Sequence, residues 1–383
     1  MRLSSHFRFF LLLFIVVPVS FSSCKNEHEA DRNSEIEIST DYKIKYAQGF
    51  DIQYFNSYKK LIVKSPYPDS KQDFIYTLSN KIFEDTDEIE TIGIPLDKIV
   101  ATSTTHVPML EILGAADALV GFPNAEYITS RVTRDRIEQG ELIDIGKDMG
   151  LNTEMVIALQ PDAVIGFALD DSDKSYSTLR KNNIPIIFNG DWLEETPLGR
   201  AEWIKFFGAL LDRDREADSI FNQIEKEYLE ACEIARESEQ SPTVMSGILF
   251  KDQWNLPAGE SFTARLYKDA NTDYLWKDSK GQGSLVLNFE SVLDRAREAD
   301  FWIGSGIYTS RQDLIEANGH YAEFKAYDEN RIYTFSKRKG DGGGIIYFEL
   351  GPLQPHVVLK DLIKVTHPDL LPEYEPFFLQ PLD

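Results

Sequence analysis

The stretch GLNTEMVIALQPDAVIGF, residues Gly150–Phe167, has the signals of a helix that leads directly into a buried strand. Asn152 is a favoured helix N-cap, and Glu154 in the first turn interacts favourably with the helix dipole. Pro161 cannot continue the helix, and the apolar run Ala163–Phe167 that follows is typical of a strand covered on both faces. We therefore expect a helix before Pro161 and a strand after it, which is the alternation of an α/β fold.

The same alternation extends to both sides of this stretch. Upstream, Ile99–Ser103 and Ala118–Phe122 are strand-like and are separated by a helical segment; downstream, Ile184–Phe188 is a further apolar strand. A second series of strands and helices begins at Thr243 and ends with a helix predicted over Gly351–Val365. Apolar strands separated by helices predict mostly parallel sheets.

A long helical region separates the two series. Leu198–Leu211 is predicted to be helical, and Asp214–Glu237 follows without glycine or proline. About 24 helical residues would extend for about 36 Å, as far as a small domain is wide. The predicted fold class is therefore α/β, with two lobes joined by one long rigid helix.

The N-terminus has the pattern of an exported protein. Arg2 and Arg8 precede the apolar run Phe9–Val19, which is typical of a secretory signal peptide and too short to span a bilayer. The tripeptide before Cys24 resembles a bacterial lipobox, although Phe21 stands where Leu is usual. We expect Cys24 to carry lipid and to anchor the protein in the cell envelope. The expected segments are a signal peptide (1–23), a flexible tether (24–40), an N-terminal lobe (41–196) with a β-rich extension (41–96), connecting helices (197–240) and a C-terminal lobe (241–383).

Charge and cysteine content exclude several classes of protein. The 383-residue chain has a formal net charge of −23, which argues against nucleic-acid binding. If Cys24 is lipidated, only Cys232 remains, so no internal disulfide is expected. We expect a monomer.

Four stretches together resemble a known family. Gly150–Phe167 is similar to the N-lobe signature of ABC-transporter binding proteins for iron complexes, siderophores and vitamin B12. Ile99–Gly114, Pro197–Leu211 and Asp341–Leu362 resemble other parts of the same family in the same order. The resemblance covers about residues 97 to 370, and it implies a ligand cleft between the lobes.

The family resemblance also implies functional residues. In that family each lobe presents a glutamate to the membrane subunits of an ABC permease, and the matching positions are Glu154 and Glu349, both expected to be exposed. Ligand contacts are expected from loops at the carboxyl ends of strands. The candidates are Thr104, Thr105, His106, Tyr127, Phe167, Trp254, Tyr308, Arg338 and Tyr347.

Several alternatives for the ligand remain open. The resemblance implies a ferric siderophore, another iron complex or cobalamin, and a haem receptor of the same fold is a variant. His106 can contact the ligand, coordinate its metal or simply begin a helix. A bare Zn or Mn binder needs several convergent His, Asp or Glu ligands, and few histidines are available. An extracellular hydrolase is a further alternative, but neither G-x-S-x-G nor H-E-x-x-H occurs. The expected protein is not an enzyme, and it has no resident cofactor or metal.

Overall fold

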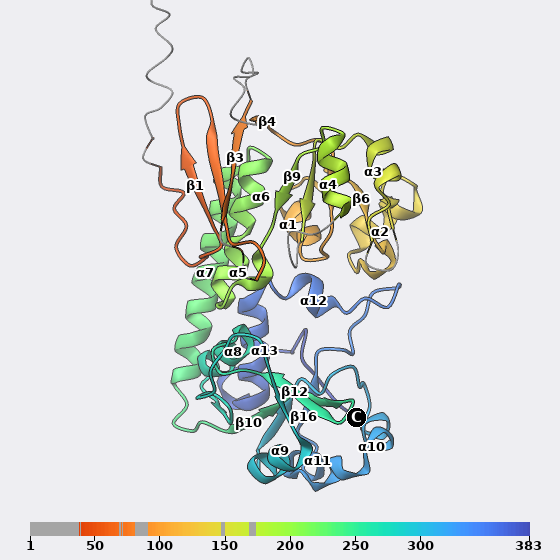
Figure 1. Ribbon diagram of the computed structural model, residues 1–383. Coiled ribbons are helices and arrows are strands. Elements are labelled where there is room, and N and C mark those ends of the chain that lie inside the picture. Colours follow the sequence, from red (N-terminus) through yellow and green to blue (C-terminus); the bar gives the residue numbers. More distant parts are fainter. Residues whose placement is uncertain are drawn as a thin grey trace, which may run out of the picture.

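The computed structural model describes residues 38, 40–68, 70, 72–80, 91–146, 150–167 and 174–383. The predicted signal peptide, Cys24 and nearly all of the predicted tether lie outside these residues. Figure 1 shows two lobes, one above the other, and the long helix α7 (Asp214–Arg236) running along one side from the upper lobe to the lower. The predicted fold class, α/β with two lobes, is confirmed.

The N-terminal lobe is built on a five-stranded sheet in the order β7-β6-β5-β8-β9. All four neighbouring pairs are parallel. Its strands are β5 (Ile99–Ala101), β6 (Leu119–Phe122), β7 (Ile143–Asp144), β8 (Ala163–Gly166) and β9 (Ile186–Phe188). Its helices are α1 (His106–Ile112), α2 (Arg131–Glu138), α3 (Thr153–Leu159) and α4 (Lys174–Lys181). Strands β5, β8 and β9 are buried along their whole length, which explains their uninterrupted apolar sequences.

A separate four-stranded sheet forms the extension predicted before this lobe. Its order is β1-β2-β3-β4, with antiparallel pairs from β1 to β3 and a parallel pair between β3 and β4. The strands are β1 (Phe50–Tyr54), β2 (Lys59–Lys64), β3 (Asp73–Ser79) and β4 (Thr91–Gly93). Phe50 packs against Trp203, with ring centroids 4.6 Å apart, so the extension covers the connecting helices.

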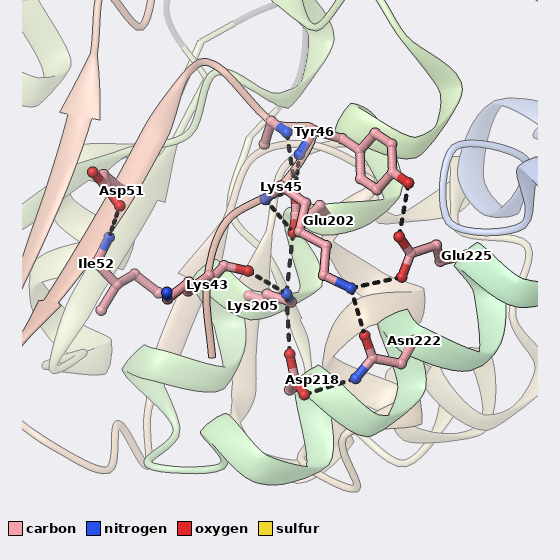
Figure 2. A network of polar contacts seen from close by, with 11 residues as sticks. Lys43, Lys45, Tyr46, Asp51, Ile52, Glu202, Lys205, Asp218, Asn222 and Glu225 are labelled. Atoms are coloured by element: carbon pink, nitrogen blue, oxygen red, sulfur yellow. Dashed lines mark hydrogen bonds and ion pairs between the residues drawn. The ribbon is translucent and has the colours of Figure 1, made fainter. Parts of the chain in front are cut away.

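A buried carboxylate fixes the segment before β1 to those helices (Figure 2). Glu202 is fully buried, and its carboxylate accepts hydrogen bonds from the backbone N–H groups of Lys45, Tyr46 and Ala47 at 2.9, 2.7 and 2.9 Å. The ammonium of Lys205, also buried, lies 3.1 Å from the same carboxylate. The extension is thus attached to the junction of the two lobes.

The sequence predicted one helix before α7, over residues 198–211, but the structure has two helices there. They are α5 (Pro197–Glu202) and α6 (Ile204–Leu210), and Trp203 both ends α5 and begins α6. All residues of α6 are buried. In α7 the buried side chains recur every three or four residues, which is the spacing of one helix face. These buried side chains are Ala217, Phe221, Ile224, Tyr228, Ala231, Cys232 and Ala235.

The C-terminal lobe contains two sheets. The larger has the order β13-β10-β15-β16-β17, parallel except for β17, and the smaller is the antiparallel sheet β11-β12-β14. Their strands are β10 (Thr243–Ser246), β11 (Ile248–Phe250), β12 (Gln253–Pro257), β13 (Asp273–Tyr274), β14 (Ser284–Leu287), β15 (Phe301–Ile303), β16 (Ile332–Thr334) and β17 (Gln380–Pro381). Gly247, with a φ of +86°, separates β10 from β11 and directs them into different sheets.

The remaining helices belong to this lobe. They are α8 (Phe262–Asp269), α9 (Phe289–Ala296), α10 (Arg311–Ala317), α11 (Lys325–Asp328), α12 (Ile346–Leu350) and α13 (Pro355–Thr366). Short 3-10 helices occur in both lobes, at η2 (Ala116–Ala118), η3 (Ala125–Tyr127), η4 (Asp191–Leu193), η5 (Gly319–Glu323) and η6 (Pro368–Leu370). None of the helices in the described part of the chain is long and apolar enough to span a membrane.

Candidate ligand cleft

A cavity of about 400 Å³ lies where the two lobes face each other. Thr105, just before α1, and Arg200, on α5, line it from above; strands β12 and β14 and helices α8 and α12 line it from below. Figure 1 shows α5 above α8, with α12 to the right of α5 and slightly lower. The volume is within the range of about 300 to 1,000 Å³ that is usual for small-molecule sites.

Arg200 is the positively charged group of this cavity. Its Nε donates to the carbonyl oxygen of Glu194 at 3.2 Å, and its Nη2 donates to the carbonyl oxygen of Trp192 at 2.9 Å. The guanidinium carbon lies 4.2 Å from the centre of the Phe262 ring, which belongs to the C-terminal lobe. Burial lowers the pKa of Arg200, and the nearby acidic groups oppose that change.

The floor of the cavity is aromatic. Tyr347 lines it and stacks on Phe335, with ring centroids 4.1 Å apart and 22° between the ring planes. Burial raises the pKa of Tyr347 to about 12, so its hydroxyl is protonated at neutral pH. The neighbouring Phe348 also lines the cavity and is exposed. Rings of this kind offer flat apolar surface to a ligand.

The roof next to α1 is polar. The Thr105 hydroxyl donates to the carboxylate of Asp191 at 2.7 Å, and it lies 2.9 Å from the hydroxyl of Ser103. Thr104 belongs to the same turn, where its carbonyl oxygen accepts from the N–H of Val107. Among the predicted ligand residues, Thr105 and Tyr347 therefore line the cavity; their contact with a ligand stays a prediction.

His106 and Trp254 lie elsewhere, because both side chains are fully buried. The ring of His106 packs on Phe207 of α6, with centroids 5.3 Å apart, and burial lowers its pKa. The Trp254 indole donates to the carbonyl oxygen of Ser246 at 2.9 Å inside the C-terminal lobe. His106 begins α1 and Trp254 lies in β12, and both side chains point into the cores of the lobes and not into the cavity.

The other five predicted residues, including Thr104, are at least partly accessible but do not line the cavity. Phe167 directly follows β8 and packs against Trp192, with ring centroids 5.4 Å apart. Tyr127 is exposed, and Tyr308 is half-buried. The guanidinium of Arg338 lies over the ring of Phe377 at 4.7 Å.

Comparison with known proteins decides the family. The family model described as "Periplasmic binding protein" matches residues 99–338, which is more than half of the chain. The chain belongs to the periplasmic binding protein family. The predicted family is thereby confirmed.

Individual relatives of this periplasmic binding protein are distant. An uncharacterized lipoprotein of Methanocaldococcus jannaschii is 24% identical, over 94% of this chain and 92% of that protein. CeuE of Helicobacter pylori, solved as a Ni-His complex, superposes with a TM-score of 0.56 at 16% identity, covering 75% of this chain and 88% of that one. A periplasmic heme binding protein of Pseudomonas aeruginosa gives a TM-score of 0.55 at 16% identity, covering 75% and 98%. The two solved structures show that the fold is shared.

In this periplasmic binding protein Glu349 departs from its expected exposure, since only 3% of its surface is accessible. Its carboxylate accepts hydrogen bonds from the backbone N–H groups of Thr129 and Ser130 at 2.6 and 3.0 Å. Those two residues precede α2 in the opposite lobe. Burial raises the pKa of Glu349, and the N–H donors oppose that change. Glu349 therefore joins the two lobes and is not available to an external partner.

Glycines beside Glu349 bring the two backbones together. A Cβ atom at Gly342 would lie 1.8 Å from the carbonyl oxygen of Glu126, and one at Gly344 would lie 2.0 Å from that of Tyr127. Only glycine fits at such distances. The loop between β16 and α12 thus presses against the N-terminal lobe, where Figure 1 shows it rising toward α2.

Glu290 was not among the predicted residues, but its position at the start of a helix matches that of Glu154 more closely than the position of Glu349 does. Glu154 follows Asn152, whose side chain caps α3 by accepting from the N–H of Met155 at 3.2 Å. Glu290 follows Asn288, whose side chain caps α9 by accepting from the N–H of Ser291 at 2.8 Å. Both glutamates are exposed.

This likeness is visible in the sequence. The tetrapeptide Leu-Asn-Thr-Glu at 151–154 corresponds to Leu-Asn-Phe-Glu at 287–290, and each begins a helix that leads to a buried parallel strand. A search for the repeated Leu-Asn-x-Glu pattern would have found Glu290. Arg200 lay within the stretch Pro197–Leu211 that suggested the family, but nothing in the sequence placed it at a cavity.

Across the residues that the structure describes, no group of three or more His, Cys, Asp or Glu side chains is arranged to hold a metal ion. His106 is buried away from the cavity, and His320 lies on the exposed surface beside Glu323.

Proposed function

We propose that this protein is the lipid-anchored solute-binding component of an ABC importer, which captures a metal chelate between its lobes and delivers it to a membrane permease. The cavity lined by residues of both lobes carries this proposal. Membership of the periplasmic binding protein family supports it, as do the similar structures described as heme-binding or iron-binding. The chelate is cargo: it is bound and released without chemical change.

The lining of the cavity suits a large, partly flat ligand. Tyr347, Phe348 and Phe262 supply aromatic surface from the lower lobe, while Arg200 and Thr105 supply polar groups from the upper lobe. Other polar side chains, such as Asn255 and Gln282, also line the cavity. Aromatic surface beside oriented polar groups is typical of specific small-molecule sites. The proposed ligand is a ferric siderophore or another iron complex, with cobalamin and haem as the alternatives.

Binding can be tested with the full-length protein purified in detergent. Ferric siderophore, ferric citrate, haem and cobalamin are added separately, while tryptophan fluorescence and visible absorbance are recorded. We expect saturable one-to-one binding of one class, with the chelate recovered unchanged. Failure to bind any of these classes would contradict the proposal, and recovery of a chemically altered chelate would favour an enzyme.

For the permease we propose docking through Glu154 and Glu290. Both are exposed carboxylates in the first turn of a helix, and each lies in a different lobe. Such carboxylates can accept paired hydrogen bonds from arginine side chains of a partner. We do not include Glu349 in this proposal, because only 3% of its surface is accessible.

Charge reversal tests the docking role. Glu154→Lys together with Glu290→Lys should reduce cellular uptake of the radiolabelled ligand about tenfold or more, since two charged contacts become repulsive. Ligand affinity of the purified double variant should stay unchanged. Glu138→Lys with Glu239→Lys is the matched control, because both residues are exposed and neither begins a helix. If uptake by the Glu154→Lys, Glu290→Lys double variant is unchanged, or if both double variants lose uptake equally, docking does not occur at these sites.

Lipid attachment at Cys24 is part of the same proposal. It rests on the sequence Phe21-Ser22-Ser23-Cys24 after an apolar run, and related proteins of Methanocaldococcus jannaschii are named lipoproteins. Cys24→Ala should move the protein from the membrane fraction to the soluble fraction after cell lysis. A variant that stays with the membrane would contradict the anchor.

A further inference from the structure

We infer that the cleft selects chelates that carry peripheral anionic oxygens, and that Arg200 is the residue that recognises them. This inference rests on the proposed function, and it adds the charge of the cargo. The anionic oxygens can be carboxylates or catecholates at the edge of the complex.

The position of Arg200 is fixed before any ligand arrives. Two backbone carbonyl oxygens, those of Glu194 and Trp192, accept hydrogen bonds from Nε and Nη2. The ring of Phe262 supports one face of the guanidinium at 4.2 Å. A guanidinium carries five N–H donors, so these contacts leave three, including both donors of Nη1. Because Arg200 lines the cavity, the remaining donors are held ready for a ligand there.

The charge of Arg200 has no ion-pair partner in the described part of the chain, where no carboxylate oxygen lies within 4.0 Å of it. The nearest acidic side chains are bonded elsewhere. The Asp191 carboxylate accepts from the Thr105 hydroxyl at 2.7 Å. The Glu194 carboxylate accepts from the N–H groups of Gln48 and Gly49 at 2.9 and 2.8 Å, and from the Trp203 indole.

This arrangement favours an anion from outside the chain. A partly buried charge without a close counter-ion is costly, and an incoming carboxylate or catecholate that pairs with it recovers that cost. Charge-assisted, paired hydrogen bonds from arginine are among the strongest that proteins form. The rest of the molecule is strongly acidic, with a net charge of −23, so a local cation is what allows an anionic cargo to enter.

Two synthetic ferric chelates of similar size separate charge from shape. One is a hexadentate tris(catecholate), which is triply negative, and the other is a hexadentate tris(hydroxamate), which is uncharged. Their affinities are measured by fluorescence quenching for the full-length wild type and for Arg200→Gln, Arg200→Lys and Arg236→Gln. Arg236 is the control, since it is exposed at the far end of α7. Thermal melting establishes that each variant is folded.

We expect the wild type to prefer the anionic chelate, and Arg200→Gln to weaken only that chelate, by about ten- to a hundredfold. Arg200→Lys should recover part of the loss, and Arg236→Gln should change nothing. If the wild type prefers the neutral chelate, or if Arg200→Gln weakens both chelates equally or neither, the inference is overturned while the proposed function stands. If the wild type binds neither synthetic chelate, and also binds none of ferric siderophore, ferric citrate, haem and cobalamin, the proposed function itself fails.

Discussion

His106 is a fully buried histidine, and its burial has a measurable consequence for stability. Burial lowers its pKa in the folded protein, so as the pH falls through about 6.5 the unfolded chain takes up a proton that the folded chain does not. Folding stability due to this residue is therefore lost on acidification. The difference in unfolding free energy between wild type and His106→Gln should shrink by about 1 kcal/mol between about pH 7.5 and pH 5.5. Urea denaturation at both pH values measures this difference.

His320 supplies the matched control for that experiment. Its side chain is 71% exposed, so His320→Gln removes no buried imidazole. If the difference in unfolding free energy between wild type and His106→Gln does not vary with pH, His106 protonates equally in the folded and unfolded states.

Individual cleft residues were predictable only in part. Thr105 and Tyr347 follow from their positions at the ends of expected elements, and both line the cavity. The same reasoning failed for His106 and Trp254, since a position in the chain does not fix the direction of a side chain. Arg200 could not be identified because its contact with Phe262 joins segments about 60 residues apart.

Among the elements, the attachment of the β-rich extension depends on Glu202 (Figure 2). Its carboxylate accepts hydrogen bonds from three backbone N–H groups and pairs with Lys205, and both charged side chains are buried. Glu202→Ala orphans the backbone donors and removes one of the two carboxylates beside Lys205, whose ammonium keeps Asp218 at 3.1 Å. The change should lower the unfolding free energy by about 3 kcal/mol. Chemical denaturation followed by tryptophan fluorescence measures the loss.

A more accessible ion pair beside it is the control. Lys45 and Glu225 are 2.8 Å apart, and the lysine side chain is 44% exposed. Glu225→Gln should cost less than about 1 kcal/mol, as surface ion pairs usually do. Equal losses in the two variants would mean that Glu202 is not the group that holds the extension.

Helix and strand positions were largely predictable, because local signals determine them. The helix expected before Pro161 is α3, and its Asn152 cap is present. Breaks and exact starts were harder to predict: the region 198–211 is interrupted at Trp203, and the last helix, expected from Gly351, begins at Pro355 as α13. At Trp203 the interruption accompanies packing of the indole against Phe50 of the extension, a neighbour that is distant in sequence.

For the whole molecule, the two-lobed layout was predictable and the relation between the lobes was not. The two series of apolar strands indicated two lobes, and a helix without glycine or proline indicated the rigid connection. The contact between the lobes depends on Glu349 and on glycines that approach a backbone from the other lobe. Such a contact has no signature within either segment.

That contact also limits how far the lobes can move. Helix α7 extends from one lobe to the other, and on the opposite side of the cleft the buried Glu349 carboxylate holds the N–H groups of Thr129 and Ser130. Ligand binding should therefore change the radius of gyration by less than about 1 Å, well below the change in a wide hinge closure. Glu349→Ala should enlarge the ligand-free protein and increase its compaction on binding, whereas Glu154→Ala, at an exposed carboxylate, should not. Small-angle X-ray scattering with and without ligand distinguishes these outcomes, and a large compaction of the wild type would show that the lobes open despite both connections.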